Sequence, residues 1–110
     1  MVTAKIDIKR IAKEFVARLE PEVHVKTVIL YGSYAHGRAD EWSDIDIAVI
    51  SNDFKKMDSF KQAEFLALRK KGCDSRLEPL AFTLEEYENA SHLTFLGEIK
   101  RTGKVIFETK

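Results

Sequence analysis

The amino-acid sequence predicts a small α/β or α+β sandwich, and three observations lead to this fold class. Stretches in which apolar residues recur with helical spacing alternate with short β-branched runs. The chain has 110 residues, enough for one hydrophobic core and too few for a catalytic domain plus a separate substrate domain. No internal repeat, low-complexity tract or linker interrupts it. We therefore expect a single domain over residues 1–110, with helices packed on a sheet.

The first half of the chain predicts a helix followed by two strands. Over residues 6–20, apolar residues recur mostly three or four positions apart and the pattern ends at a proline, which indicates an amphipathic helix. The run VKTVILY, residues 25–31, is apolar and β-branched, as expected of a buried strand. Residues 45–50 predict a second strand, and a polar loop containing Gly37 joins the two.

The next segment predicts a turn, a helix and a third strand. Residues 51–58 read as a turn before a helix over about residues 58–71, which ends at lysines and a glycine, as helix C-termini favour. The run RLEPLAF, residues 76–82, predicts a strand. Pro79 favours an edge position or a local break, because proline cannot donate a backbone hydrogen bond to a neighbouring strand.

The remaining residues predict a capped helix, a last helix and a short strand. Thr83 is followed three positions later by Glu86, which is the spacing of a capping box. Residues 95–101 favour a helix and residues 104–107 a terminal strand.

Charge and hydropathy exclude several classes of function. The 18 basic and 18 acidic side chains give no net field that would attract nucleic acid or anionic lipid. We therefore do not expect direct nucleic-acid binding, and the charge balance argues against a processive nucleic-acid enzyme. No apolar run approaches the ~20 residues of a membrane-spanning helix, and the first ten residues lack the apolar core of a secretory signal. A cytoplasmic location is the resulting expectation. Cys73 is the single cysteine and is interpreted as a bystander.

Two carboxylates stand out in YGSYAHGRADEWSDIDIAVIS, residues 31–51. Asp44 and Asp46 lie two positions apart inside what reads as a strand, so they point to one face with backbones about 6.6 to 7 Å apart. The intervening and following apolar residues, Ile45, Ile47 and Val49, then face the other side. Two like charges held together predict a divalent cation or a raised pKa, and Mg²⁺ prefers carboxylates, water and phosphate oxygens.

The pair Gly32-Ser33, at the end of the preceding strand, predicts the other half of a phosphate site. Glycine permits a tight turn and close approach of a phosphate, and the Ser33 hydroxyl and nearby amides can donate hydrogen bonds to it. A helix starting at about Ser33 would add a favourable dipole. Either motif alone is a common turn or cap, but with ten residues between Ser33 and Asp44 the combination is specific.

The stretch GSYAHGRADEWSDID fits the GSx10DxD signature and resembles the DNA polymerase β-like nucleotidyltransferases, in particular their minimal, MNT-type branch. The resemblance implies a nucleotidyltransferase fold with a mixed sheet flanked by helices. It also implies that Gly32 and Ser33 hold a nucleoside triphosphate and that Asp44 and Asp46 bind Mg²⁺. Two ions and an NTP, ATP first among the candidates, would then take part.

The resemblance calls for a third carboxylate on a following strand, as metal ligand and as base toward the attacking hydroxyl. Glu78 is the candidate inside the expected strand, and Asp74 is the alternative. A plain surface role for Glu78, paired with Arg76, stays open. The predicted catalytic and metal-binding set is therefore Asp44, Asp46 and Glu78.

Two further positions depart from or extend the family pattern. Many relatives carry a basic residue three positions after the motif serine, where this chain has His36, with Arg38 close by. We expect both to contribute to the nucleotide site with Gly32 and Ser33, His36 in a pH-sensitive way. An exposed loop role for His36 is the alternative. Trp42 is expected to pack under the loop.

The resemblance implies transfer of a nucleoside monophosphate, AMP from ATP, to a hydroxyl on a partner. Minimal relatives resemble the antitoxin of toxin-antitoxin pairs, whose partner is a helical HEPN-type protein. One alternative is a non-catalytic antitoxin that only binds nucleotide and partner. Another is a small-molecule nucleotidyltransferase, as in aminoglycoside modification, with its acceptor site formed across a homo-oligomer. The apolar residues of the second half could supply an interface patch or belong to the core; they are Tyr87, Leu93, Phe95, Leu96 and Phe107.

Overall fold

The computed structural model describes residues 7–109, which form one mixed sheet flanked by helices. The elements in chain order are α1 (Ile8–Leu19), β1 (Thr27–Tyr31), β2 (Ile45–Ile50), the 3-10 helix η1 (Asn52–Lys56), α2 (Ser59–Lys70), β3 (Leu77–Phe82), α3 (Leu84–Glu88), α4 (Phe95–Thr102) and β4 (Lys104–Glu108). The predicted α/β class and the mixed sheet are confirmed. The start of the first predicted helix, residue 6, lies outside the described residues.

The strands are ordered β3-β2-β1-β4. Strand β1 pairs antiparallel with β2 and with β4, whereas β2 and β3 are parallel. A parallel pair needs a crossover, and the chain supplies one through η1 and α2. Strand β3 is an edge strand, so the interpretation of Pro79 is confirmed.

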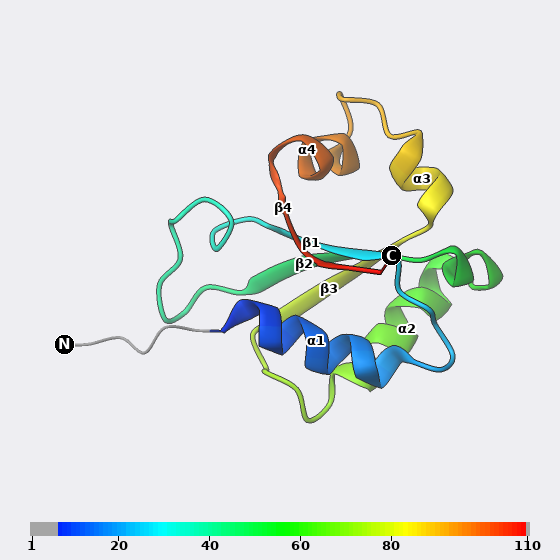
Figure 1. The fold of residues 1–110 in the computed structure, drawn as a ribbon, viewed down its shortest axis with the longest axis horizontal. Coiled ribbons are helices and arrows are strands. Elements are labelled where there is room, and N and C mark those ends of the chain that lie inside the picture. The colour runs from blue at the N-terminus through cyan, green and yellow to red at the C-terminus, as the bar shows by residue number, and fades with distance from the viewer. Residues whose placement is uncertain (1–6, 110) are drawn as a thin grey trace.

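The sheet separates two layers of helices (Figure 1). Helices α1 and α2 cover one face and pack on the larger hydrophobic core, which includes Phe15 and Leu66 from the helices. Helices α3 and α4 lie on the other face, where Ile99 packs with Ala48 and Ile50. Because strand residues alternate between faces, even-numbered positions of β2 point toward α3 and α4. Asp46 therefore lies on the same face as these two helices.

The local predictions hold at several element ends. The capping box of α3 is present, with the Thr83 hydroxyl accepting from the Glu86 amide and the Glu86 side chain accepting from the Thr83 amide. The odd-numbered positions of β2 lie in the larger core, as the alternation predicts. In the described residues, no helix is both long and apolar enough to cross a membrane.

Four local predictions are wrong. Residues 51–58 contain the 3-10 helix η1 where a turn was expected; Ser51 caps it by accepting from the Asp53 amide. Trp42 does not pack under the loop: it is 83% exposed. The loop between β1 and β2 that carries it extends beyond the end of the sheet (Figure 1). The other two concern Ser33 and Asp44 and are described with the site.

The apolar residues considered as an interface patch are only partly exposed. Leu93 is 85% and Phe95 is 54% exposed, whereas Leu96 is buried in the α4 layer. Tyr87 and Phe107 are partly buried and pack against the two cores. Of these five residues, only Leu93, just before α4, and Phe95, at its start, are exposed.

Candidate active site

Three side chains form a row across the sheet on the face covered by α3 and α4. The strand register pairs Tyr31 of β1 with Asp46 of β2, and pairs Asp46 with Glu78 of β3. Paired residues on adjacent strands project from the same face. Asp46 thus stands between a phenol on one side and a second carboxylate on the other.

Asp44 directly precedes β2 and is exposed, so it is not inside the strand as the sequence suggested. The turn before it is held by Asp40, whose carboxylate accepts from the Trp42 amide at 2.8 Å and from the Ser43 hydroxyl at 3.2 Å. Asp44 is nevertheless close enough to Asp46 to act on its charge. The pair therefore shares one end of the sheet face.

The electrostatics show that negative charge is concentrated here. Burial, followed by the nearby charges of Asp44 and Glu78, raises the pKa of Asp46 above its ordinary value. Burial, then Asp46 and Glu78, raises the pKa of Tyr31 to about 12. Since each of these shifts disfavours a further negative charge, a cation or a proton would be bound favourably beside Asp46.

Gly32 brings the backbone of the loop against the central carboxylate. Its φ is +75°, in the region that favours glycine, and a Cβ at this position would collide with Oδ2 of Asp46. Gly37 also has a positive φ, +69°, but a Cβ there would meet no atom. The requirement for glycine is therefore steric as well as conformational at Gly32 and only conformational at Gly37.

The segment after Gly32 consists of hydrogen-bonded turns, so the expectation of a helix beginning at about Ser33 is wrong. The Ala35 amide donates to the Gly32 carbonyl at 3.1 Å, and the amides of His36 and Arg38 donate to the Ser33 carbonyl at 3.2 and 3.0 Å. These bonds span three or five residues, whereas an α-helix needs successive bonds four residues apart. Without the helix, no helix dipole contributes to an anion site here.

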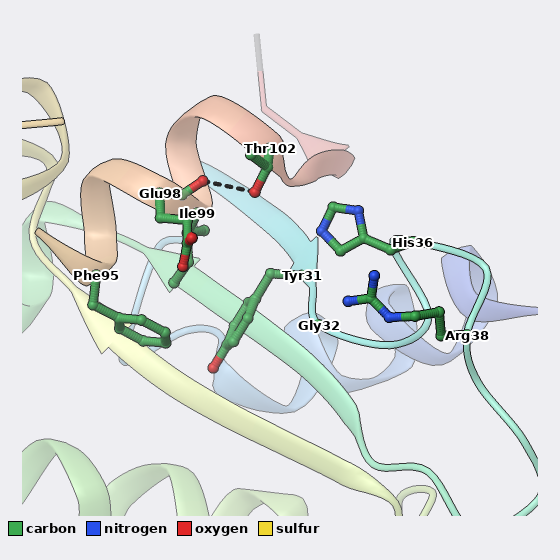
Figure 2. A pocket seen from close by; sticks show the side chains of 8 residues that line it. All are labelled: Tyr31, Gly32, His36, Arg38, Phe95, Glu98, Ile99 and Thr102. Atoms are coloured by element: carbon green, nitrogen blue, oxygen red, sulfur yellow. Dashed lines mark hydrogen bonds between the residues drawn. The ribbon is translucent and has the colours of Figure 1, made fainter. Parts of the chain in front are cut away.

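A pocket of about 380 Å³ opens beside the row (Figure 2). Its lining residues are Tyr31, Gly32, His36, Arg38, Phe95, Glu98, Ile99 and Thr102. The structure thus brings together three of the four predicted nucleotide-binding residues, and Ser33 is adjacent to the lining in sequence. His36 and Arg38 are both exposed, and they lie on the loop side of the pocket.

The amino-acid sequence matches a known family. The family described as Polymerase beta, Nucleotidyltransferase matches residues 9–110. The chain belongs to this polymerase β nucleotidyltransferase family. The match extends over nearly all of the chain, well beyond the GSx10DxD motif, so the sequence resemblance is confirmed.

Solved structures share the nucleotidyltransferase fold. A proposed nucleotidyltransferase from Sulfolobus solfataricus is 16% identical, with a TM-score of 0.66 and 97% of this chain and 93% of that chain covered. A chain of a toxin-antitoxin structure with AMP-PNP is 22% identical, with a TM-score of 0.62 and coverage of 93% and 74%. A chain of a mutant toxin-antitoxin MntA-HpeT is 22% identical, with a TM-score of 0.61 and coverage of 96% and 76%. A search among curated protein sequences finds no match.

The nucleotidyltransferase site fits a divalent cation in its chemistry. Its donors are carboxylate oxygens, the ligands that Mg²⁺ prefers, and their mutual repulsion at Asp46 is what such a cation would relieve. Within residues 7–109, no three His, Cys, Asp or Glu side chains are already gathered closely enough to hold an ion. Asp44, Asp46 and Glu78 share one end of the sheet but do not form a finished ligand set. Their metal-binding role remains a prediction.

The alternative third carboxylate, Asp74, is occupied by another contact. It accepts from Nε of Arg76 at 2.9 Å and from Nη2 at 2.6 Å, and the hydrogen bonds hold its pKa below the ordinary value. Arg76 therefore pairs with Asp74 and not with Glu78. Glu78 is exposed and stands beside Asp46, which favours it as the third carboxylate.

Sequence reasoning missed the part of the site that α4 contributes. Glu98 and Thr102 were not identified, and Phe95 was considered only as core or interface. The signal available was weak: their spacing of three and four places them on one side of a helix, but which site the helix faces depends on the chain reversal before β4. Tyr31, directly before Gly32, was also not identified, because its place beside Asp46 depends on the register between β1 and β2.

Proposed function

We propose that this chain is a Mg²⁺-dependent nucleotidyltransferase that moves AMP from ATP to a hydroxyl on a HEPN-type partner toxin, as the antitoxin of a toxin-antitoxin pair. The observation that carries the proposal is the register of β2 and β3, which sets Glu78 beside Asp46. A third carboxylate next to the Asp44–Asp46 pair is what the two-ion chemistry of nucleotidyl transfer needs.

The order of residues across the sheet gives each end of the row a role. Gly32, His36 and Arg38 lie on the β1 side, where a guanidinium, an imidazole and a close backbone suit the phosphates of the leaving pyrophosphate. Glu78 lies on the edge strand at the opposite side of Asp46. An in-line displacement needs the attacking and leaving oxygens on opposite sides of the α-phosphorus, and this order accommodates both.

The chain's residues would then act as follows. The acceptor hydroxyl approaches from the Glu78 side, its oxygen bonds to the α-phosphorus, and the bond from that phosphorus to pyrophosphate breaks. The hydroxyl proton passes to the Glu78 carboxylate. Asp44, Asp46 and Glu78 would hold two Mg²⁺ ions, which supply charge neutralisation of the phosphates and orientation of the reacting oxygens. His36 and Arg38 would orient the departing phosphates.

Two observations support a protein as the acceptor. Two of the structures with this fold are of toxin-antitoxin systems, and one of them contains AMP-PNP. On this chain, Leu80 follows Glu78 by two positions on the same face and is 40% exposed. This side chain is accessible to a protein that approaches the Glu78 end of the row.

The test is to incubate the chain with Mg²⁺ and ATP, alone and with a HEPN-type protein encoded beside it, and to measure the intact masses of both proteins. We expect one or more AMP additions on the partner only, absent with Asp44→Ala or Asp46→Ala. Each of the other three NTPs is tested in parallel, because a different nucleotide would correct the donor and leave transfer intact. Co-purification of the two proteins without a mass gain from any NTP would contradict transfer and indicate a binding antitoxin.

A further inference from the structure

The pocket beside the carboxylates has two chemically different walls. His36 and Arg38 form one wall, from the loop after β1, and Phe95 and Glu98 stand on the other, from α4 (Figure 2). Tyr31 lies between them. A triphosphate is attracted by the Arg38 guanidinium and repelled by a carboxylate. The α4 wall therefore suits a part of the ligand that carries no negative charge.

The apolar portion of this wall is an exposed aromatic ring. Phe95 packs edge-to-face on Tyr31, with ring centroids 5.6 Å apart and planes at 85°, yet it remains 54% exposed. Contact with Tyr31 fixes the ring in place without covering it. A half-exposed, positioned aromatic ring at a pocket rim is a stacking surface for a planar base.

The polar portion of the wall is a carboxylate with free hydrogen-bonding capacity. Glu98 is exposed and, within residues 7–109, no lysine or arginine forms an ion pair with it. The two cations that follow it on α4 are directed elsewhere: Lys100 donates to the Tyr87 carbonyl at 3.1 Å, and Arg101 to the His92 carbonyl at 3.3 Å. An ionised carboxylate only accepts hydrogen bonds, so its partner in the pocket must be a donor.

We propose that the α4 wall is a ribonucleoside subsite, in which Phe95 stacks on the base and the Glu98 carboxylate accepts hydrogen bonds from the ribose hydroxyls. The proposal rests on the proposed function, which sets the α-phosphate beside Asp46. Phe95 and Glu98 are one helical turn apart, on the same side of α4, as base and sugar of one nucleotide require. The pocket volume of about 380 Å³ lies within the usual range for small-molecule sites. Glu98 then selects ribonucleotides over 2′-deoxyribonucleotides.

The experiment measures the dissociation constants of ATP and 2′-deoxy-ATP, with Mg²⁺, by equilibrium titration. For the unmodified chain we expect ATP to bind about tenfold more tightly, since a site built to pair with a hydroxyl discriminates against its absence. Glu98→Ala should bring the ratio close to one and leave 2′-deoxy-ATP bound as tightly or more tightly, because a repelling charge is gone. A misfolded variant would instead lose both nucleotides.

Two further variants complete the test. Glu64→Ala removes an exposed carboxylate from α2, on the opposite face of the sheet, and should keep the ratio of the unmodified chain. Phe95→Ala should weaken ATP and 2′-deoxy-ATP by the same factor, about tenfold, through lost stacking. An unchanged ratio in Glu98→Ala, equal binding of both nucleotides by the unmodified chain, or no binding of either would overturn the subsite.

The outcomes separate this inference from the proposed transfer. Selective ribonucleotide binding that depends on Glu98, without any transfer to a partner, leaves the subsite standing and removes the proposed activity. Transfer that proceeds equally from ATP and 2′-deoxy-ATP removes the subsite and leaves the activity.

Discussion

Asp46 and Glu78 are paired positions on the adjacent parallel strands β2 and β3, so two carboxylates separated by 32 residues of sequence stand side by side on one face of the sheet. The helical crossover between the strands sets this relationship. Neighbouring charge is part of what raises the pKa of Asp46, and it is the reason this end of the sheet suits a cation.

The first prediction is that one substitution at Asp46 has opposite effects on stability and on activity. In the absence of Mg²⁺, Asp46→Asn should raise the melting temperature at neutral pH, because the partly buried carboxylate is repelled by Asp44 and Glu78. Nucleotidyl transfer should fall by about 100-fold or more. Thermal melts and initial rates measure the two effects. A variant that is less stable than the unmodified chain without metal would contradict the electrostatic reading.

The second prediction compares two glycines. Gly32→Ala forces a Cβ onto Asp46 and imposes a positive φ on alanine, so we expect loss of transfer and destabilisation of more than about 1 kcal/mol. Gly37→Ala is the matched control. Its φ is also positive but its Cβ meets nothing, so it should cost about 1 kcal/mol and retain transfer. Denaturant titration and transfer assays of both variants measure the difference, and equal effects would show that backbone strain alone matters.

The third prediction separates the two candidates for the third carboxylate. Glu78→Gln should reduce the rate of transfer by about 100-fold or more, with little change in stability because Glu78 is exposed. Asp74→Asn should keep transfer within about threefold and cost about 1 kcal/mol of stability, because it breaks the paired hydrogen bonds with Arg76. The assignment would be reversed if Asp74→Asn abolished transfer in a folded protein.

The Asp74 contribution also has a defined pH dependence. Its folded-state pKa is lowered below the ordinary 3.8, so the stabilisation is fully present above that value and is lost as the pH falls through the lowered pKa. The stability difference between the unmodified chain and Asp74→Asn should therefore shrink on acidification below about pH 4. Chemical denaturation at a series of pH values measures it.

The fourth prediction concerns Tyr31. Its pKa of about 12, against an ordinary 10.0, means that the unfolded chain releases this proton before the folded one. Its contribution to stability is therefore fully present below about pH 10 and is lost as the pH rises toward 12. Ultraviolet titration should show one late-ionising tyrosine that is absent in Tyr31→Phe. Asp46→Asn should move that transition to lower pH, whereas no movement would mean that burial and Glu78, without Asp46, cause the shift.

The predictable part of the fold consists of features with a local cause. Apolar periodicity located the helices, and Thr83 with Glu86 defined the capping box, because both depend on residues within one or two turns. The exposure of Trp42 was not predictable. Whether an aromatic residue is covered depends on where a 13-residue loop travels, and no residue near Trp42 determines that.

The candidate site also contains residues that local spacing predicts and residues that only the tertiary structure places. Gly32, Ser33, Asp44 and Asp46 could be recognised because they belong to one continuous stretch, in which spacing alone relates them. Glu78 could be proposed as a candidate, but its place beside Asp46 required the β2–β3 register. The α4 wall was not foreseen, since the fold brings Phe95 and Glu98 across from a segment about sixty residues away. Backbone spacing acts over a few residues, whereas the packing of α4 on the sheet depends on the whole core, so the motif could be read from the chain and the pocket around it only from the folded molecule.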